Sequence, residues 1–302
     1  MIERTFQNIR GGELSDADQQ SFLVSLGWSS GTTWEGLLQS KRVLMISEAG
    51  AGKTYECRKQ AQHLWDAGEP AFFIELAALA STDLRSLLDD EEEARLDVWL
   101  SSQSDVATFF LDSIDELKLS RGSFEQALKR LKKVISSQLD RVRVVITTRP
   151  ILFDQQLVRR LLPIPPAPST EPSEERFAKI AMRDHQHRQA VNKAEEPAAD
   201  WRTVALMPLS DAQIVEFAKL QGVEDPGVLL DDLQKRNAQE FARRPQDLIE
   251  LCADWREYKR IRTHRDQVAT NVRIKLQPRE DRPEPAELSV DKAIEGASRL
   301  AL

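Results

Sequence analysis

The stretch Ser47-Glu48-Ala49-Gly50-Ala51-Gly52-Lys53-Thr54 decides how this sequence is interpreted. It follows the apolar run Val43–Ile46 and opens a segment with helical periodicity, Thr54–Ala67. The stretch matches the phosphate-binding pattern G-x-x-x-x-G-K-[ST] at every defined position except the first, where Ser47 replaces glycine. Because backbone N–H groups at a helix N-terminus attract phosphate, the sequence predicts a nucleotide site at this turn.

The residue types of the loop suit this chemistry. Gly50 and Gly52 allow backbone angles and a close approach that a Cβ would block. Lys53 is expected to reach the β- and γ-phosphate oxygens, and the hydroxyl of Thr54 to bind Mg²⁺. Ser47 stands where the strand ends, outside the group of amides that bind the anion. We therefore expect the replacement of glycine by Ser47 to weaken phosphate binding only modestly. The predicted ligands are ATP and Mg²⁺, and the predicted cofactor-binding residues of the loop are Glu48, Ala49, Gly50, Ala51, Gly52, Lys53 and Thr54.

A second motif is the apolar strand candidate Ala107–Asp112, which ends in an acid. Open parallel sheets bind ligands at the carboxyl ends of their strands, so Asp112 is expected to orient Mg²⁺ together with Thr54. Two more acids follow, Asp115 and Glu116, and either one suits polarisation of the attacking water. We therefore predict Asp112, Asp115 and Glu116 as catalytic residues.

A third motif is the strand candidate Val142–Thr147, which runs into Thr148, Arg149 and Pro150. Arg149 is expected to sense the γ-phosphate, because a guanidinium is planar and permanently charged. The alternative is a surface arginine before a proline. Separations of 112 − 53 = 59 residues between Lys53 and Asp112, and 149 − 112 = 37 between Asp112 and Arg149, leave room for the intervening helices and strands.

Apolar runs that alternate with helical patterns predict the fold. The strand candidates are Val43–Ile46, Ala71–Leu76, Ala107–Asp112, Val142–Thr147 and Thr203–Met207. The helical patterns between them include Thr54–Ala67, Leu84–Leu100 and Phe124–Leu139. Such alternation indicates a mostly parallel sheet flanked by helices. After Pro208 the patterns become wholly helical, so the predicted fold class is an α/β P-loop NTPase domain followed by a small all-helical domain.

Composition narrows the class of partner and the compartment. The 302 residues are 41% hydrophobic, which is ordinary for a soluble globular protein. Their net charge of −7 argues against a chain that mainly coats nucleic acid or an anionic membrane. A basic stretch at 256–265 leaves nucleic-acid binding as a disfavoured alternative. Two cysteines without C-x-x-C spacing disfavour a disulfide framework or a zinc site. With no signal peptide or spanning segment, the expected localisation is cytoplasmic.

The three motifs together resemble those of the NACHT branch of the STAND NTPases, the signal-transducing ATPases with numerous domains. The resemblance rests on Ser-Glu-Ala-Gly-Ala-Gly-Lys-Thr at 47–54, Phe-Leu-Asp-Ser-Ile-Asp-Glu-Leu at 110–117 and Ile-Thr-Thr-Arg-Pro at 146–150. Arg243-Arg244-Pro245 is similar in place to a Gly-x-Pro element of that family, which implies that Pro245 contacts the base and sugar. Three positions depart from the family pattern, namely Ser47, Ser113 and Arg243, and the last puts the adenine contact in doubt.

The resemblance implies a slowly hydrolysing molecular switch in signalling. ADP holds the helical domain against the nucleotide domain in such a protein, and exchange for ATP releases it and permits a homo-oligomer to form. Bacterial proteins of this kind are often antiphage defence ATPases, an extension that rests on the family alone. The sequence specifies neither the trigger, the effector, the oligomer size nor a preference between ATP and dATP.

Four segments are expected from these patterns. They are an N-terminal helical lead-in at 1–40, the NACHT-like P-loop domain at 41–207 with a Pro/Glu-rich insertion at 163–200, a helical domain at 208–265, and a linker with the start of a winged-helix-like region at 266–302. The helical pattern Ser289–Leu302 stops without a cap, so it either docks on something or continues into a longer polypeptide.

Two other functions remain open at this stage. An ATP-driven remodelling enzyme of the additional-strand P-loop class would show rapid turnover and preassembled rings. A nonhydrolytic nucleotide-binding module, from a truncated longer protein, would show no phosphate release above background. A switch would instead retain close to one ADP per chain after purification.

Overall fold

The computed structural model describes residues 2–9, 31–112, 121–149, 155–165 and 200–261, with residues 289, 291–292 and 295–296. The chain divides into two compact units. We call Glu3–Met207 the sheet unit, and Pro208–Leu302 with Met1–Ile2 the helical unit. Asp115, Glu116, most of the predicted insertion and most of the region after 265 lie outside the described residues.

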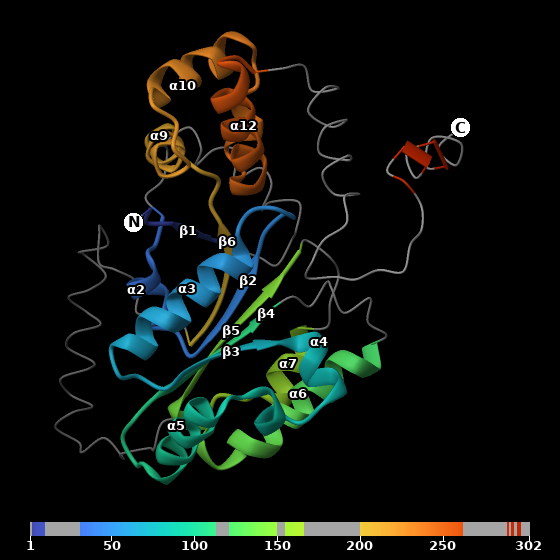
Figure 1. Ribbon diagram of the computed structural model, residues 1–302. Coiled ribbons are helices and arrows are strands. Elements are labelled where there is room, and N and C mark those ends of the chain that lie inside the picture. Colours follow the sequence, from blue (N-terminus) through green and yellow to red (C-terminus); the bar gives the residue numbers. More distant parts are fainter. Residues whose placement is uncertain are drawn as a thin grey trace, which may run out of the picture. The chain divides into compact units, whose positions relative to one another are not determined.

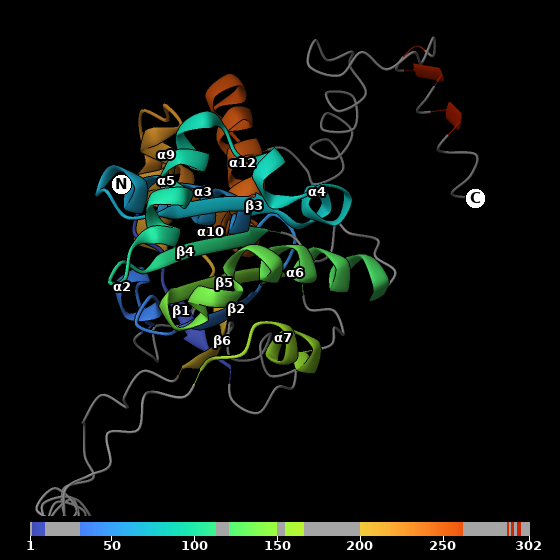
Figure 2. The same ribbon diagram turned by 90° about the horizontal axis from the view of Figure 1, so that it is seen from below.

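A six-stranded sheet forms the centre of the sheet unit, with the strand order β1-β6-β2-β5-β4-β3 (Figure 2). Every pairing is parallel except that of β1 with β6, which is antiparallel. This sheet confirms the predicted fold class. In it, β5 lies between the strand that leads into the loop at 47–54 and the strand that ends at Asp112. The strands are β1 (Phe6–Asn8), β2 (Arg42–Ile46), β3 (Ala71–Glu75), β4 (Ala107–Asp112), β5 (Val142–Thr148) and β6 (Trp201–Leu206).

Helices cover both faces of this sheet (Figure 1). One face packs on α2 (Trp34–Leu37) and α3 (Lys53–Asp66). The other face packs on α4 (Leu76–Ser81), η1 (Leu84–Leu87), α5 (Asp90–Ser101), α6 (Arg121–Ile135), η2 (Ser136–Arg141) and α7 (Gln155–Leu161). Successive β2 side chains alternate between the two cores, Val43 and Met45 on one side and Leu44 and Ile46 on the other, and this double burial explains why the strand is apolar throughout. Among the described residues, no helix is long and apolar enough to cross a membrane.

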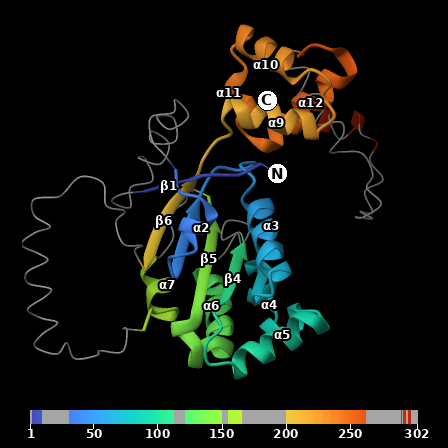
Figure 3. The ribbon, with the colours of Figure 1, turned by 90° about the vertical axis from the view of Figure 1, so that its left-hand side faces the viewer.

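Between Pro208 and Ile261 the helical unit contains four helices (Figure 3). Their buried side chains form one apolar core. The four helices are α9 (Asp211–Leu220), α10 (Pro226–Lys235), α11 (Gln239–Ala242) and α12 (Pro245–Tyr258). Ser210 caps α9, because its side chain accepts from the backbone N–H of Gln213 while the Gln213 side chain accepts from the Ser210 N–H. The core includes Ile214, Leu229 and Trp255.

Three local predictions were wrong. The pattern at 84–100 is not one helix, because Asp89 and Glu92 form a capping box that starts α5 anew after η1. The second predicted strand, Ala71–Leu76, ends one residue early at Glu75, because α4 begins at Leu76. Within the expected helical lead-in, Phe6–Asn8 form a strand, because the backbone of β6 offers them a pairing edge that no local pattern reveals.

Both cysteines, Cys57 and Cys252, are buried and free. Burial raises the pKa of the Cys57 thiol well above its ordinary value, and the nearby Asp112 and Glu56 carboxylates add to this effect. Burial also raises the pKa of Cys252 to about 11. The raised pKa values make both thiols less reactive, because the reactive species is the thiolate.

We predict that the native protein resists thiol reagents at mildly alkaline pH. At pH 8, a rise in pKa from 9.0 to about 11 lowers the thiolate population of Cys252 roughly a hundredfold. Labelling should therefore be at least about a hundredfold slower in buffer than in guanidinium chloride, and the rate for Cys252 should climb as the pH approaches 11. A chromogenic disulfide reagent measures both rates, and prompt labelling of either native thiol contradicts the described burial.

Candidate functional site

The turn between β2 and α3 has the backbone of an anion-binding loop. Gly50 and Gly52 adopt positive φ angles of 76° and 94°, a region that disfavours residues with a Cβ. Gly52 is also the N-cap of α3, and it provides no side-chain capping bond to the first turn. Helix N-termini carry unsatisfied N–H groups and a partial positive charge, so a phosphate group fits here as the missing acceptor.

The side chain of Lys53 organises this loop from within. It is only 8% exposed, and its Nζ donates to the carbonyl oxygens of Ser47 at 2.6 Å and Glu48 at 2.9 Å. The backbone N–H of Ser47 donates to the Thr148 carbonyl at 3.1 Å, which extends the β2–β5 pairing by one step. Ser47 therefore belongs to the end of the sheet, where its conformation does not require the glycine of the sequence pattern.

Asp112 joins three elements at the carboxyl edge of the sheet. Its Oδ2 accepts from the Thr54 hydroxyl at 2.7 Å, and its Oδ1 accepts from the Thr147 hydroxyl at 2.6 Å. Asp112 is 5% exposed and Thr147 is fully buried, so the carboxylate is held in one orientation. A loop that opens α3, an acid that ends β4 and an intervening β5 are the defining features of one architecture. The sheet unit has a P-loop NTPase fold.

The chemistry of the donor set fits Mg²⁺. The Thr54 hydroxyl and the Asp112 carboxylate are hard oxygen ligands on adjacent elements. Among the described residues, no group of three or more His, Cys, Asp or Glu side chains could hold a metal ion by itself. Mg²⁺ does not require one, because it commonly takes one or two protein oxygens and completes its shell with waters and substrate phosphates.

The other predicted site residues divide into three groups. Arg149 directly follows β5 and is exposed, at the same strand edge as Asp112. Asp115 and Glu116 lie outside the described residues. Pro245 is the first residue of α12 in the helical unit, so its contact with a nucleotide stays a prediction.

Thr147 and Arg4 are the residues at this site that sequence reasoning missed. A hydroxyl pair at the end of β5 was visible in the sequence, but its contact with Asp112 depends on the insertion of β5 beside β4. Arg4 is 3% exposed and donates from Nη1 to the carbonyl of Ala51 in the loop at 3.3 Å. Nothing in the local pattern around Arg4 indicates this contact.

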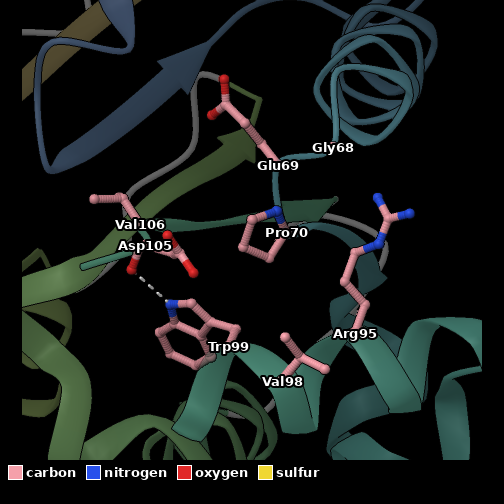
Figure 4. A pocket seen from close by; sticks show the side chains of 8 residues that line it. All are labelled: Gly68, Glu69, Pro70, Arg95, Val98, Trp99, Asp105 and Val106. Carbon is pink, nitrogen blue, oxygen red and sulfur yellow. Dashed lines mark hydrogen bonds between the residues drawn. The ribbon is translucent and has the colours of Figure 1, made fainter. Parts of the chain in front are cut away.

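A second feature, an open pocket of about 340 Å³, lies at the opposite ends of the strands (Figure 4). Gly68, Glu69 and Pro70 line it just before β3, and Asp105 and Val106 just before β4. On its α5 side, the Trp99 indole N–H donates to the Asp105 carbonyl at 3.0 Å. Because the loop and Asp112 are at the carboxyl ends of the strands, this pocket is separate from the P-loop site.

Comparison with known proteins gives weak structural likeness only. No protein-family model and no curated protein matches the sequence. A similar solved structure is a FIGL-1 AAA domain in complex with ADP, with 14% identity and a TM-score of 0.32, covering 98% of this chain and 93% of that one. A second is a Walker-type ATPase, PABY2304, of Pyrococcus abyssi, with 12% identity and a TM-score of 0.37, covering 86% of this chain and 72% of that one. A third is PCH-2 of C. elegans, with 12% identity and a TM-score of 0.31, covering 96% of this chain and 69% of that one. Likeness at this level carries no information on the activity of this chain.

Proposed function

We propose that the protein binds ATP with Mg²⁺ at the P-loop and hydrolyses it slowly. The observation that carries the proposal is Asp112, which is bound at once by the Thr54 hydroxyl from α3 and the Thr147 hydroxyl from β5. This arrangement places a fixed carboxylate beside an uncapped helix N-terminus and a buried ammonium group. Together these groups suit a metal-bound polyphosphate.

Each part of the site has a separate task under this proposal. The loop amides and Lys53 bind the phosphates, and Thr54 with Asp112 holds the metal ion, which neutralises charge on the phosphate oxygens. Arg149 reads the γ-phosphate from the end of β5. Glu116, with Asp115 beside it, polarises the attacking water. Pro245 contacts the base and sugar.

We further propose that hydrolysis serves a STAND-type switch rather than a metabolic reaction. The division of the chain into a sheet unit and a helical unit supports this idea, because a switch needs two parts whose relation depends on the ligand. ADP would favour a closed state, and ATP a state that forms homo-oligomers in response to an unidentified trigger and effector. The process that this switch would serve is signalling, of which antiphage defence is one form.

The experiment that tests it compares the purified chain with Glu116→Gln and Asp115→Asn. We expect close to one ADP per chain after purification and slow phosphate release. Removal of a general base typically costs between a hundredfold and ten-thousandfold, so Glu116→Gln should lower release at least about a hundredfold while ATP still binds. Asp115→Asn is the matched control, and the larger loss identifies which acid is the base.

The outcomes also separate the alternatives. Phosphate release that is unchanged from background in all three proteins indicates a nonhydrolytic binding module. Rapid turnover by preassembled rings without retained ADP indicates a remodelling enzyme. Failure of ATP and ADP to bind at all removes the proposed function itself.

A further inference from the structure

Arg4 connects two distant backbone segments inside the sheet unit. Its Nη1 donates to the carbonyl of Ala51, between the two glycines of the phosphate loop, and its Nη2 donates to the carbonyl of Met207. Arg4 and Met207 are both 3% exposed, so little water competes for these bonds. A charged donor on a backbone carbonyl in such a setting makes a stronger hydrogen bond than a neutral one.

Met207 is the last residue of the sheet unit, and Pro208 begins the helical unit. The backbone N–H of Met207 donates to the Thr5 carbonyl at 3.0 Å, in line with the pairing of Phe6 with Leu206. The chain also passes from the helical to the sheet unit between Ile2 and Glu3. Both connections between the units therefore come within a few residues of Arg4.

Arg4 makes strong hydrogen bonds, but one of its buried donors has no acceptor in the part of the chain that the structure describes. Burial lowers the pKa of Arg4, and the negative charge of Glu56 on α3 opposes that shift. Glu56 is itself 4% exposed and accepts from the Trp34 indole N–H at 3.4 Å. Among the described residues, the Nε of Arg4 is buried and has no hydrogen-bond acceptor. A guanidinium with a spare buried donor has room to exchange acceptors when one of the two segments moves.

We propose that Arg4 is a positioning residue that couples phosphate binding at the loop to the chain connection at Met207. Binding of phosphate at the amides of the loop moves the Ala51 carbonyl, and Arg4 transmits this change to the Met207 carbonyl and to the start of the helical unit. The inference rests on the proposed nucleotide binding. It adds the specific route by which occupancy of the loop reaches the connection between the units.

The test is hydrogen exchange by mass spectrometry on the full chain, with and without saturating ADP and Mg²⁺. In the unaltered protein, we expect ADP to change exchange in the segment 47–56 and also in 204–210. In Arg4→Met, the change at 47–56 persists while the change at 204–210 is lost. The dissociation constant for ADP should rise at least about fivefold, the lower end of typical coupling between sites. Arg4→Lys, which keeps a charged donor, should recover part of both effects.

Arg202→Met is the matched control. Arg202 lies on β6 and likewise donates to a backbone carbonyl, that of Gly36, at 3.2 Å, but this bond involves neither the loop nor Met207. This variant should retain the ADP affinity and the exchange response at 204–210. Circular dichroism checks that each variant is folded. If Arg4→Met does not fold, Arg4→Lys still tests the coupling.

Two results overturn the coupling while leaving the proposed function intact. One is ADP binding without any change of exchange at 204–210 in the unaltered protein. The other is a response of both segments, in folded Arg4→Met, that equals that of the unaltered protein. Absence of ADP binding to the unaltered protein instead overturns the proposed function together with this inference.

Discussion

Replacing Lys53 with alanine is expected to weaken ADP and ATP binding by roughly tenfold to a hundredfold. Lys53 is 8% exposed, so its charge acts on phosphate through little water, and its Nζ also holds the carbonyls of Ser47 and Glu48 in place. Hydrogen bonds to charged groups contribute about 1.5–3 kcal/mol, and the loss of about 3 kcal/mol corresponds to a little over a hundredfold in affinity. Calorimetric titration with each nucleotide and Mg²⁺ measures the effect.

Lys59→Ala controls for the loss of a positive charge on the same helix. Lys59 lies on α3 and its Nζ is 4.0 Å from Glu56, away from the carbonyls that Lys53 binds. We expect its affinity to stay within about threefold of the unaltered protein, since a single partly exposed ion pair contributes about 1 kcal/mol or less. Equal binding by Lys53→Ala and the unaltered protein would show that the loop is not the nucleotide site.

The second large effect is expected from Asp112→Asn, which should lower phosphate release at least about a hundredfold. The substitution removes the charge that is proposed to hold Mg²⁺, and a metal ion supplies several kcal/mol of charge stabilisation in phosphoryl transfer. An asparagine amide can still accept from one hydroxyl and donate to the other, so the contacts with Thr54 and Thr147 can be retained. We therefore expect ADP binding without Mg²⁺ to change by less than about threefold.

Glu75→Gln is the control for Asp112→Asn. Glu75 ends β3 and is the register partner of Asp112 in the neighbouring strand. Its carboxylate is exposed and pairs with Arg58 at 2.7 Å. Phosphate release by this variant should match that of the unaltered protein, measured by a coupled phosphate assay with magnesium varied. If Asp112→Asn retains magnesium-dependent hydrolysis at the normal rate, Asp112 does not orient the metal.

The central sheet could be predicted from the sequence because each parallel strand is buried on both faces. Double burial makes the strand apolar along its length, and such runs are visible without any alignment. The run at 107–112 was predicted with both of its ends correct, and β2 differs by one residue. The glycine turn at 47–54 was equally visible, since Gly50 and Gly52 supply the positive φ angles that the turn requires.

Contacts between distant segments could not be predicted in the same way. Thr147 contacts Asp112 only because β5 lies between β2 and β4. No local sequence pattern predicts this strand order. Strand β1 has three residues, too few for a periodic signal, and exists because β6 offers it an edge. Arg4 depends on that strand for its place. Each of these features is tertiary in origin, which is why propensity and periodicity miss them.

The antiparallel pairing of β1 has a consequence for handling the protein. Without residues 6–8, the outer N–H and C=O groups of β6 would face solvent along an open, largely apolar border. Such borders recruit further strands and promote self-association. Residues 6–8 therefore protect the edge of β6, and a shortened version that starts at β2 would expose that edge.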